Sequence, residues 1–335
     1  LQDAGFGRQI ADWLIGINLT SVATLKYRNQ KNIRLLNVGR VLMPTLKIIY
    51  DRDKEIADFK VTKYYKLKGI FQTEDKKKFD SIYYIKAGEK FDNPEELKEI
   101  QEKIKDKNGE VVSKKITNKK EYPPYLFNLS GLQGYITSKY KGWTSDRVLK
   151  TAQQLYEKKF ITYPRTASVV LDESLKEKTA KVLNIHKKSC PYEEMIQFKS
   201  TKRIFDSKKV ESHSAIIPTY MQPGSLNESE RIVYEAVKNR FLAQFMPIAV
   251  AEDTVLHIKM QNTDIPGEFV AKGKVQLEAG WKLIEGIDAK ETILPAVKKG
   301  DVLPLIKSEI NEVERKPPKP HTENTLINIK NILLN

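Results

Sequence analysis

Tyr163, Pro164 and Arg165 stand in a row inside the stretch FITYPRTAS, which runs from Phe160 to Ser168. Pro164 fixes its own φ angle and pushes the residue before it toward an extended conformation. Residues two apart in an extended segment project to the same side, so the phenol and the guanidinium would share a face. Arginine is a bidentate partner for phosphate, and a nearby cation can help a tyrosine hydroxyl act as a nucleophile. Taken alone, however, the tripeptide fits an ordinary strand edge with an exposed arginine better.

Two other short segments carry side chains that suit a phosphate. In VESHSAIIPT, His213 comes just before an apolar run and Pro218, and an imidazole can donate to a phosphate oxygen or transfer a proton. In NVGRVLMPT, Gly39 permits close backbone approach and Arg40 can reach a phosphate. Each segment alone is explained more simply, by a solvated histidine and by a tight turn with an exposed arginine.

The charge balance of the chain points to a polyanionic partner. Lys and Arg total 58 against 43 acidic residues, which gives a formal net charge of +15. Nucleic acid is the commonest partner for such an excess. Net charge bears on association and not on fold, so a basic but well-solvated surface is the alternative.

Several classes of protein are disfavoured. The single cysteine, Cys190, excludes an intramolecular disulfide and a cysteine-rich zinc site, and it fits a reducing cytoplasm. The four histidines show no metal-ligand spacing, and runs such as ILPAV are too short to span a bilayer. There is no secretory signal and no Gly-x4-Gly-Lys-Ser/Thr loop. We therefore expect a cytoplasmic location and neither a membrane nor a nucleotide triphosphate as partner.

Periodicity predicts alternating helical and β stretches along the chain. Helical spacing predicts helices within residues 7–27, 44–50, 93–109, 127–140, 144–159, 226–245 and at the end of 316–335. Alternation and β-branched or aromatic content predict strands within 58–72, 79–85, 248–261, 267–285 and 302–315. Thr144 or Ser145, and Ser225, Asn227 or Ser229, are the candidate N-caps of two helices.

The chain is expected to be an α+β protein with more than one domain, because 335 residues exceed what one hydrophobic core usually serves. The boundaries are expected to divide it into a helical part (1–55), a β part (56–122), a helical insert (123–246), a second β part (247–315) and a helical return (316–335). The two β parts most simply form one domain that the helical insert interrupts. The chain begins without Met and stops inside a helical pattern, so we expect a fragment of a longer protein.

Together, the segments resemble one family in content and order. FITYPRTAS is similar to the Ile-Thr-Tyr-Pro-Arg-Thr-Asp-Ser active-site motif of type IA DNA topoisomerases. SHSAIIPT resembles that family's His-x-Ala-Ile-x-Pro-Thr motif, and NVGRVLMPTL resembles its Gly-Arg-Val-Gln-x-Pro-Thr-Leu segment. GRQIADWLIGINLT is similar to a helix of the topoisomerase III branch. The resemblance runs from one end of the chain to the other.

The resemblance implies an enzyme that cuts one DNA strand, passes another strand through the gap and reseals it. Tyr163 would be the nucleophile that joins a 5′ phosphate, and Arg165 would bind and polarise that phosphate. His213 would position the same phosphate or manage protons. Arg8 and Arg40 would bind backbone phosphates in the DNA groove, where Asp12 would orient its neighbours. Exchanging a phosphodiester for a phosphotyrosine ester costs little free energy, so ATP is not needed.

The resemblance also implies a torus, of which this chain would supply a fragment. The helical ends (1–55 and 316–335) would belong to the domain with the DNA groove. The β parts (56–122 and 247–315) would form an arch, and the helical insert (123–246) would be the movable domain that carries Tyr163. Single-stranded DNA is the preferred partner that the resemblance implies.

Three departures from the family pattern matter. The N-terminal Toprim domain, which holds acidic Mg²⁺ ligands, has no counterpart in this sequence, so Mg²⁺ is expected outside it and the fragment alone is expected not to cleave DNA. Ala167 stands where the family usually has Asp, and Leu42-Met43 stand where Gln and a small polar residue are common. The helix after Leu326 is short, so residues that line the groove are missing.

Two readings from different classes therefore compete. The first is the core of a strand-passage enzyme, favoured by Tyr163, Arg165 and His213. The second is a non-catalytic module that binds single-stranded DNA with the same fold, which Ala167 slightly favours. A tyrosine recombinase is weaker, because the arginine and histidine set that it needs has no place in this sequence.

Overall fold

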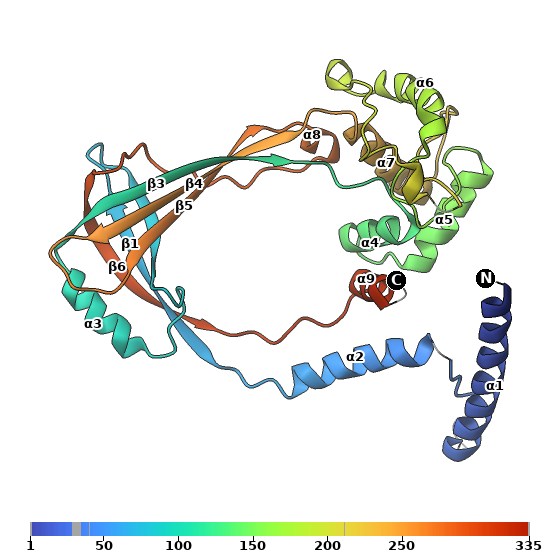
Figure 1. The fold of residues 1–335 in the computed structure, drawn as a ribbon, viewed down its shortest axis with the longest axis horizontal. Coiled ribbons are helices and arrows are strands. Elements are labelled where there is room, and N and C mark those ends of the chain that lie inside the picture. Colours follow the sequence, from blue (N-terminus) through green and yellow to red (C-terminus); the bar gives the residue numbers. More distant parts are fainter. Residues whose placement is uncertain (1, 29–34, 40, 211, 334–335) are drawn as a thin grey trace. The chain divides into compact units, whose positions relative to one another are not determined.

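The strands of a computed structural model close into one β-barrel (Figure 1). The model describes residues 2–28, 35–39, 41–210 and 212–333. Within that part of the chain, β1 to β6 pair antiparallel in the order β1-β2-β5-β4-β3-β6. The strands are β1 (Lys63–Gln72), β2 (Lys78–Tyr84), β3 (Asn108–Glu121), β4 (Ala249–Met260), β5 (Glu268–Glu278) and β6 (Val302–Glu314). Three strands precede the helical insert and three follow it, so each side of the insert contributes half of the barrel.

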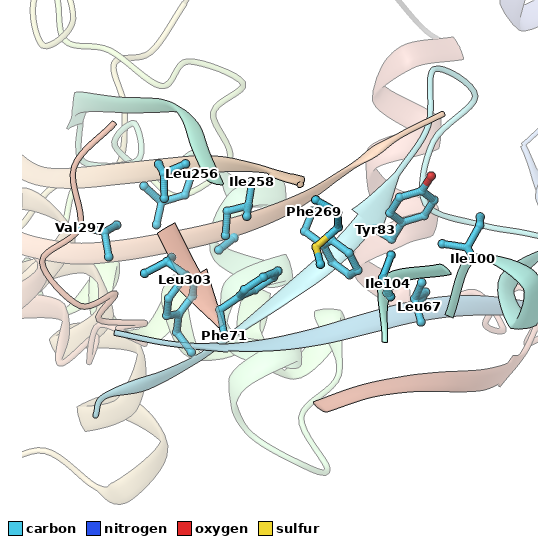
Figure 2. Packing of buried hydrophobic residues seen from close by; sticks show 14 of the residues in the cluster. Leu67, Phe71, Tyr83, Ile100, Ile104, Leu256, Ile258, Phe269, Val297 and Leu303 are labelled. Atoms are coloured by element: carbon cyan, nitrogen blue, oxygen red, sulfur yellow. The ribbon is translucent and has the colours of Figure 1, made fainter. Parts of the chain in front are cut away.

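The barrel is filled by large apolar side chains from alternating strand positions. In β2 the burial alternates, so that Phe79 and Tyr83 point inward. Figure 2 shows Phe71, Tyr83 and Phe269 meeting between the strands, and the ring centroids of Phe71 and Phe269 lie 5.5 Å apart. Helix α3 (Pro94–Ile104) adds buried aliphatic side chains such as Leu97 to the same core. Burial of each such side chain stabilises the fold by about 1.5–3 kcal/mol.

Helix α3 ends earlier than the sequence predicts. The predicted helix 93–109 stops at Ile104, and Asn108 and Gly109 are the first residues of β3. A Cβ on Gly109 would lie 2.5 Å from Cγ2 of Ile258, so only glycine lets β3 approach the barrel core here. The Asn-Gly pair therefore begins a strand and does not end the helix.

The outer half of β3 has no predicted counterpart. Residues 113–120 are all exposed and rich in lysine, so their sequence lacks the alternation that indicates a strand. Pairing with β4 holds them, from Lys114 opposite Leu256 to Glu121 opposite Ala249. In Figure 1, β3, β4 and β5 run out of the barrel together toward α8 (Lys282–Glu285).

The helical insert has two apolar clusters, and α7 (Glu228–Ala243) contributes to both. Val233 and Val237 pack with side chains of α4 (Leu129–Lys139) and α5 (Ser145–Glu157), whereas Phe241 packs with side chains such as Leu183 of α6 (Lys176–Lys187). Short 3₁₀ turns lie at Glu173–Leu175, Glu193–Met195 and Ser207–Lys209.

One of the predicted N-cap candidates caps each of the two helices. Thr144 accepts a hydrogen bond from the amide of Arg147 and caps α5. Asn227 and Glu230 form a reciprocal capping box at the start of α7. The side chains that cap these helices were among the candidates named from the sequence.

Two side chains bond the backbone where the chain leaves β3 for the helical insert. The indole Nε1 of Trp281 donates to the carbonyl of Glu121 over 2.8 Å. Nε2 of Gln244 donates to the carbonyl of Pro124, also over 2.8 Å. The passage from barrel to insert is therefore held at more than one carbonyl.

Residues 1–60 and 316–335 form a separate compact unit. Its helices are α1 (Gln2–Tyr27), α2 (Leu42–Ala57) and α9 (Glu323–Leu333). Hydroxyls of Thr20 and Thr24 accept hydrogen bonds from the amides of Val38 and Leu36, so the segment after α1 folds back on it. Helix α2 is longer than the predicted 44–50. The second unit is 61–315, and the five-part division of the chain stays a prediction.

None of the helices in the described residues is long and apolar enough to cross a membrane.

A buried ion pair generates the first prediction. Arg240 and Glu285, whose side chains are 9% and 4% exposed, lie 2.5 Å apart, and Arg240 also donates to the carbonyl of Tyr125. Glu285→Ala leaves the arginine buried without its counter-ion, so the free energy of unfolding should fall by about 3–5 kcal/mol in urea denaturation. The double variant with Arg240→Met should recover part of this loss. If Glu285→Ala were as stable as the unmodified chain, the buried ion pair between Arg240 and Glu285 would be contradicted.

Candidate active site

The turn after α5 sets the position of the Tyr163 segment. Lys159 has φ 63°, the amide of Phe160 donates to the carbonyl of Leu155 over 2.9 Å, and the amide of Lys159 donates to the carbonyl of Tyr156 over 2.8 Å. This hydrogen-bond pattern is a Schellman motif, which ends a helix with one left-handed residue. The chain therefore turns back directly after α5 and brings the next residues past its last turn.

The segment that follows pairs with the segment that carries His213. The amide of Thr162 donates to the carbonyl of Ile217 over 2.9 Å, and the amide of Thr219 donates to the carbonyl of Phe160 over 3.0 Å. The two segments thus lie antiparallel, with a bridge between Ile161 and Pro218. Residues about fifty positions apart in the sequence meet in this way.

Two threonine hydroxyls on either side of the Tyr-Pro-Arg tripeptide add to this pairing. Oγ1 of Thr162 accepts from the amide of Ile217 over 3.0 Å and donates to the carbonyl of Ala215 over 3.2 Å. Oγ1 of Thr166 donates to the carbonyl of His213 over 2.8 Å. The backbone of His213 is therefore held against the tyrosine segment.

The ring of Tyr163 contacts two other rings. Its centroid is 4.6 Å from that of His213, with planes inclined by 50°, and 5.3 Å from that of Tyr156, at 74°. Tyr163 is half-buried, whereas His213 is exposed. The structure thus brings the rings of Tyr163 and His213 together, and it adds Tyr156, which the sequence motifs do not indicate.

Arg165 is exposed two residues beyond Tyr163. In the described part of the chain, no hydrogen bond, ion pair or ring contact joins it to another residue. Pro164 between them is buried. A guanidinium that is uncommitted within the described residues, beside a held phenol, can bind an anion that approaches the phenol.

Ala167, at the usual Asp position, contacts Asn128, the residue that caps the start of α4. Its carbonyl accepts from Nδ2 of Asn128 over 2.9 Å, and Oδ1 of Asn128 accepts from the amide of Gly131 over 2.7 Å. The side chain of Ala167 is exposed, so it supplies no charge or hydrogen bond to the site.

Two of the three predicted DNA-groove residues, Arg8 and Asp12, lie in the unit formed by residues 1–60 and 316–335. Arg8 and Asp12 are exposed on α1, four positions apart, and so lie one turn from each other. Arg40 lies outside the described residues. Their roles in DNA binding stay predictions.

A buried histidine is hydrogen-bonded to the segment that carries His213. His186, on α6, is 1% exposed, and its Nε2 lies 2.7 Å from the carbonyl of Thr219. Burial lowers the pKa of His186, and the hydrogen bond to Thr219 offsets this only partly. The neutral imidazole therefore acts as a donor that fixes Thr219, whose hydroxyl in turn donates to the carbonyl of Lys159.

The described residues contain no cluster of three or more His, Cys, Asp or Glu side chains that could hold a metal ion.

Comparison with known proteins shows which family this chain is similar to. A family model described as DNA topoisomerase matches residues 1–330. The DNA topoisomerase 3 of Staphylococcus epidermidis is 32% identical over 335 residues, which cover 98% of this chain and 45% of the relative. The DNA topoisomerase 3 of Salmonella typhimurium is 31% identical and covered to 52%, and the DNA topoisomerase 1 of Aquifex aeolicus is 32% identical and covered to 58%.

A solved structure shares the fold. Full-length topoisomerase I from Thermotoga maritima superposes with a TM-score of 0.74 at 28% sequence identity, over 98% of this chain and 53% of that one. The multi-domain α+β fold is thus that of the type IA topoisomerases.

The chain belongs to the DNA topoisomerase family. It spans about half the length of the curated relatives that it matches. The family and the fold class predicted from the sequence are confirmed.

The turn after α5 yields a prediction of stability. Lys159 adopts a left-handed conformation that costs a non-glycine residue about 1 kcal/mol. Lys159→Gly should therefore raise the free energy of unfolding by about 0.5–1 kcal/mol in urea denaturation. Lys158, with φ −76°, is the matched control, because Lys158→Gly should not stabilise the chain. If Lys158→Gly raised the free energy of unfolding and Lys159→Gly did not, the left-handed conformation of Lys159 would be contradicted.

His186 yields a prediction of pH dependence. Because its pKa is lower in the folded chain than in the unfolded one, the unfolded chain binds the extra proton more readily below about pH 6.5. The contribution of His186 to stability is full above that pH and is lost as the pH falls. The nearby Lys238 lowers this pKa and Glu235 raises it, and both remain in His186→Gln.

The test follows the urea midpoints of the two proteins. Between pH 7 and pH 5 the unmodified chain should lose more stability than His186→Gln, whose amide can still donate to Thr219. Parallel losses in the two proteins would show that His186 is not a buried neutral donor.

Proposed function

We propose that the full-length protein containing this chain cleaves one DNA strand through a 5′-phosphotyrosine intermediate, passes another strand through the gap and religates the first. The hydroxyl oxygen of Tyr163 would attack the scissile phosphorus and lose its proton. The bond from phosphorus to the 3′ oxygen of the neighbouring nucleotide would break, and that oxygen would take up a proton. Religation reverses these steps, so one phosphodiester is exchanged for another and no nucleotide triphosphate is consumed.

The observation that carries the proposal is the Tyr163 ring in contact with those of His213 and Tyr156, with exposed Arg165 two residues away. Arg165 would bind the scissile phosphate and stabilise the charge that develops on it. The imidazole of His213, 4.6 Å from the phenol ring between centroids, would position the same phosphate or carry a proton. The catalytic residues proposed are therefore Tyr163, Arg165 and His213.

DNA, single-stranded by preference, is the proposed substrate. The net charge of +15 and the exposed Arg8 on α1 support a basic surface for the sugar-phosphate backbone. Arg40 is proposed as a second phosphate contact and Asp12 as a residue that orients its neighbours. A cytoplasmic location is proposed from the single cysteine.

Mg²⁺ is the cofactor proposed for the whole enzyme. The resemblance to type IA topoisomerases supports a Toprim domain outside this chain that would hold the ion. When bound there, Mg²⁺ would stabilise phosphate charge next to Tyr163. The isolated chain should accordingly bind DNA without cleaving it.

The second candidate function is a non-catalytic module that binds single-stranded DNA. Ala167 favours it, because the position where the family usually has Asp carries no carboxylate. The retained Tyr163, with its ring contacts, favours the enzyme.

Substitution of the nucleophile separates the two functions. Full-length protein with Mg²⁺ and a single-stranded oligonucleotide should give a covalent adduct that survives denaturation in gel electrophoresis. Tyr163→Phe should abolish the adduct and leave oligonucleotide affinity within about twofold, since phosphate contacts dominate binding.

The control is Tyr192→Phe, in a different part of the insert, which should form the adduct like the unmodified protein. An adduct that persists in Tyr163→Phe would overturn the assignment of the nucleophile. Absence of any adduct from the unmodified protein would favour the binding module.

A further inference from the structure

We propose that Tyr156 is a positioning residue for Tyr163, which holds the ring of the nucleophile in the orientation that presents its hydroxyl to the phosphate. This inference rests on the proposed function of Tyr163. No motif in the sequence marks Tyr156, and its role follows from contacts in the folded chain.

The first support is the geometry of the three rings. Tyr156 meets Tyr163 edge to face, at 5.3 Å between centroids and 74° between planes, which is a favoured arrangement of two aromatic rings. His213 contacts the same phenol at 4.6 Å and 50°. Because Tyr156 and His213 come from different segments, the ring of Tyr163 is restrained by two separate parts of the insert.

The second support is the way in which the backbone fixes the pair. Tyr156 lies in the last turn of α5, and its own carbonyl accepts the hydrogen bond from the amide of Lys159 that closes the Schellman motif. The amide of Phe160 closes the second bond of that motif. The backbone from Tyr156 to Tyr163 thus consists of a defined turn followed by a segment that pairs with the His213 segment.

The third support is that Tyr156 contributes little to the hydrophobic core. It is 39% exposed, whereas Val148, Ala152 and Leu155 on the same helix are fully buried in the cluster of the insert. An exposed tyrosine whose one described ring contact is with the nucleophile affects the site more than the fold.

The expected effect is kinetic. Loss of an edge-to-face contact lets the phenol sample orientations that do not lead to attack, while the DNA contacts made by other residues remain. An aromatic pair of this kind corresponds to a rate effect of about two- to tenfold.

The experiment measures the single-turnover rate of adduct formation and, separately, oligonucleotide affinity, in the full-length protein with Mg²⁺. Tyr156→Leu should slow adduct formation by about two- to tenfold with unchanged affinity. Tyr156→Phe keeps the ring and should restore the rate. Tyr220, 70% exposed and close to the His213 motif, is the matched control, and Tyr220→Leu should react at the normal rate.

A rate for Tyr156→Leu equal to that of the unmodified protein would overturn the proposal, as would a rate for Tyr156→Phe as slow as that for Tyr156→Leu. Tyr156→Met removes the ring and keeps the bulk, and it replaces the leucine variant if that variant unfolds in circular dichroism. Tyr163→Phe is measured in parallel. If that variant still forms the adduct, the proposed function fails; if it does not and Tyr156→Leu is normal, only the positioning role fails.

Discussion

The candidate site depends on the antiparallel pairing of two segments of the helical insert that lie about fifty residues apart. The amides of Thr162 and Thr219 donate across this pairing, and the hydroxyls of Thr162 and Thr166 add bonds to the segment that carries His213. Without this pairing, the phenol of Tyr163 and the imidazole of His213 would belong to unrelated loops. The buried His186 and the turn at Lys159 both act on the end of this pairing where Phe160 lies opposite Thr219. Any chemistry at this site therefore depends on the backbone hydrogen bonds of this pairing.

The Tyr163 segment belongs to the helical insert and not to the β-barrel. Strands from both sides of the insert close a single barrel, so the insert begins and ends on neighbouring strands, β3 and β4. Trp281 and Gln244 bind the backbone where the chain leaves β3, and the buried pair of Arg240 and Glu285 lies beside them. The Tyr163 segment is therefore held by a small helical core of its own, and that core is attached to the barrel by hydrogen bonds and an ion pair.

Features with a local cause could be predicted from the sequence, and features that depend on distant pairing could not. The caps Thr144 and Asn227 follow from side chains that bond neighbouring amides, and the core strand β2 follows from its own alternation. The outer half of β3 is exposed and lysine-rich, so only its ladder with β4 makes it a strand. Tyr156 was missed because its contact with Tyr163 requires a left-handed turn at a lysine, where the sequence offers no glycine to indicate it.

The family assignment and the chemistry rest on different grounds. The match over residues 1–330 places the chain among DNA topoisomerases, whereas the role proposed for each site residue rests on the motif resemblance together with the geometry around Tyr163. The most direct measurement is therefore mass spectrometry of the covalent adduct that full-length protein forms with a single-stranded oligonucleotide. If Tyr163 is the nucleophile, the digest should contain a peptide in which Tyr163 carries a nucleotide through its 5′ phosphate. A nucleotide on another residue, or a link through a 3′ phosphate, would contradict it.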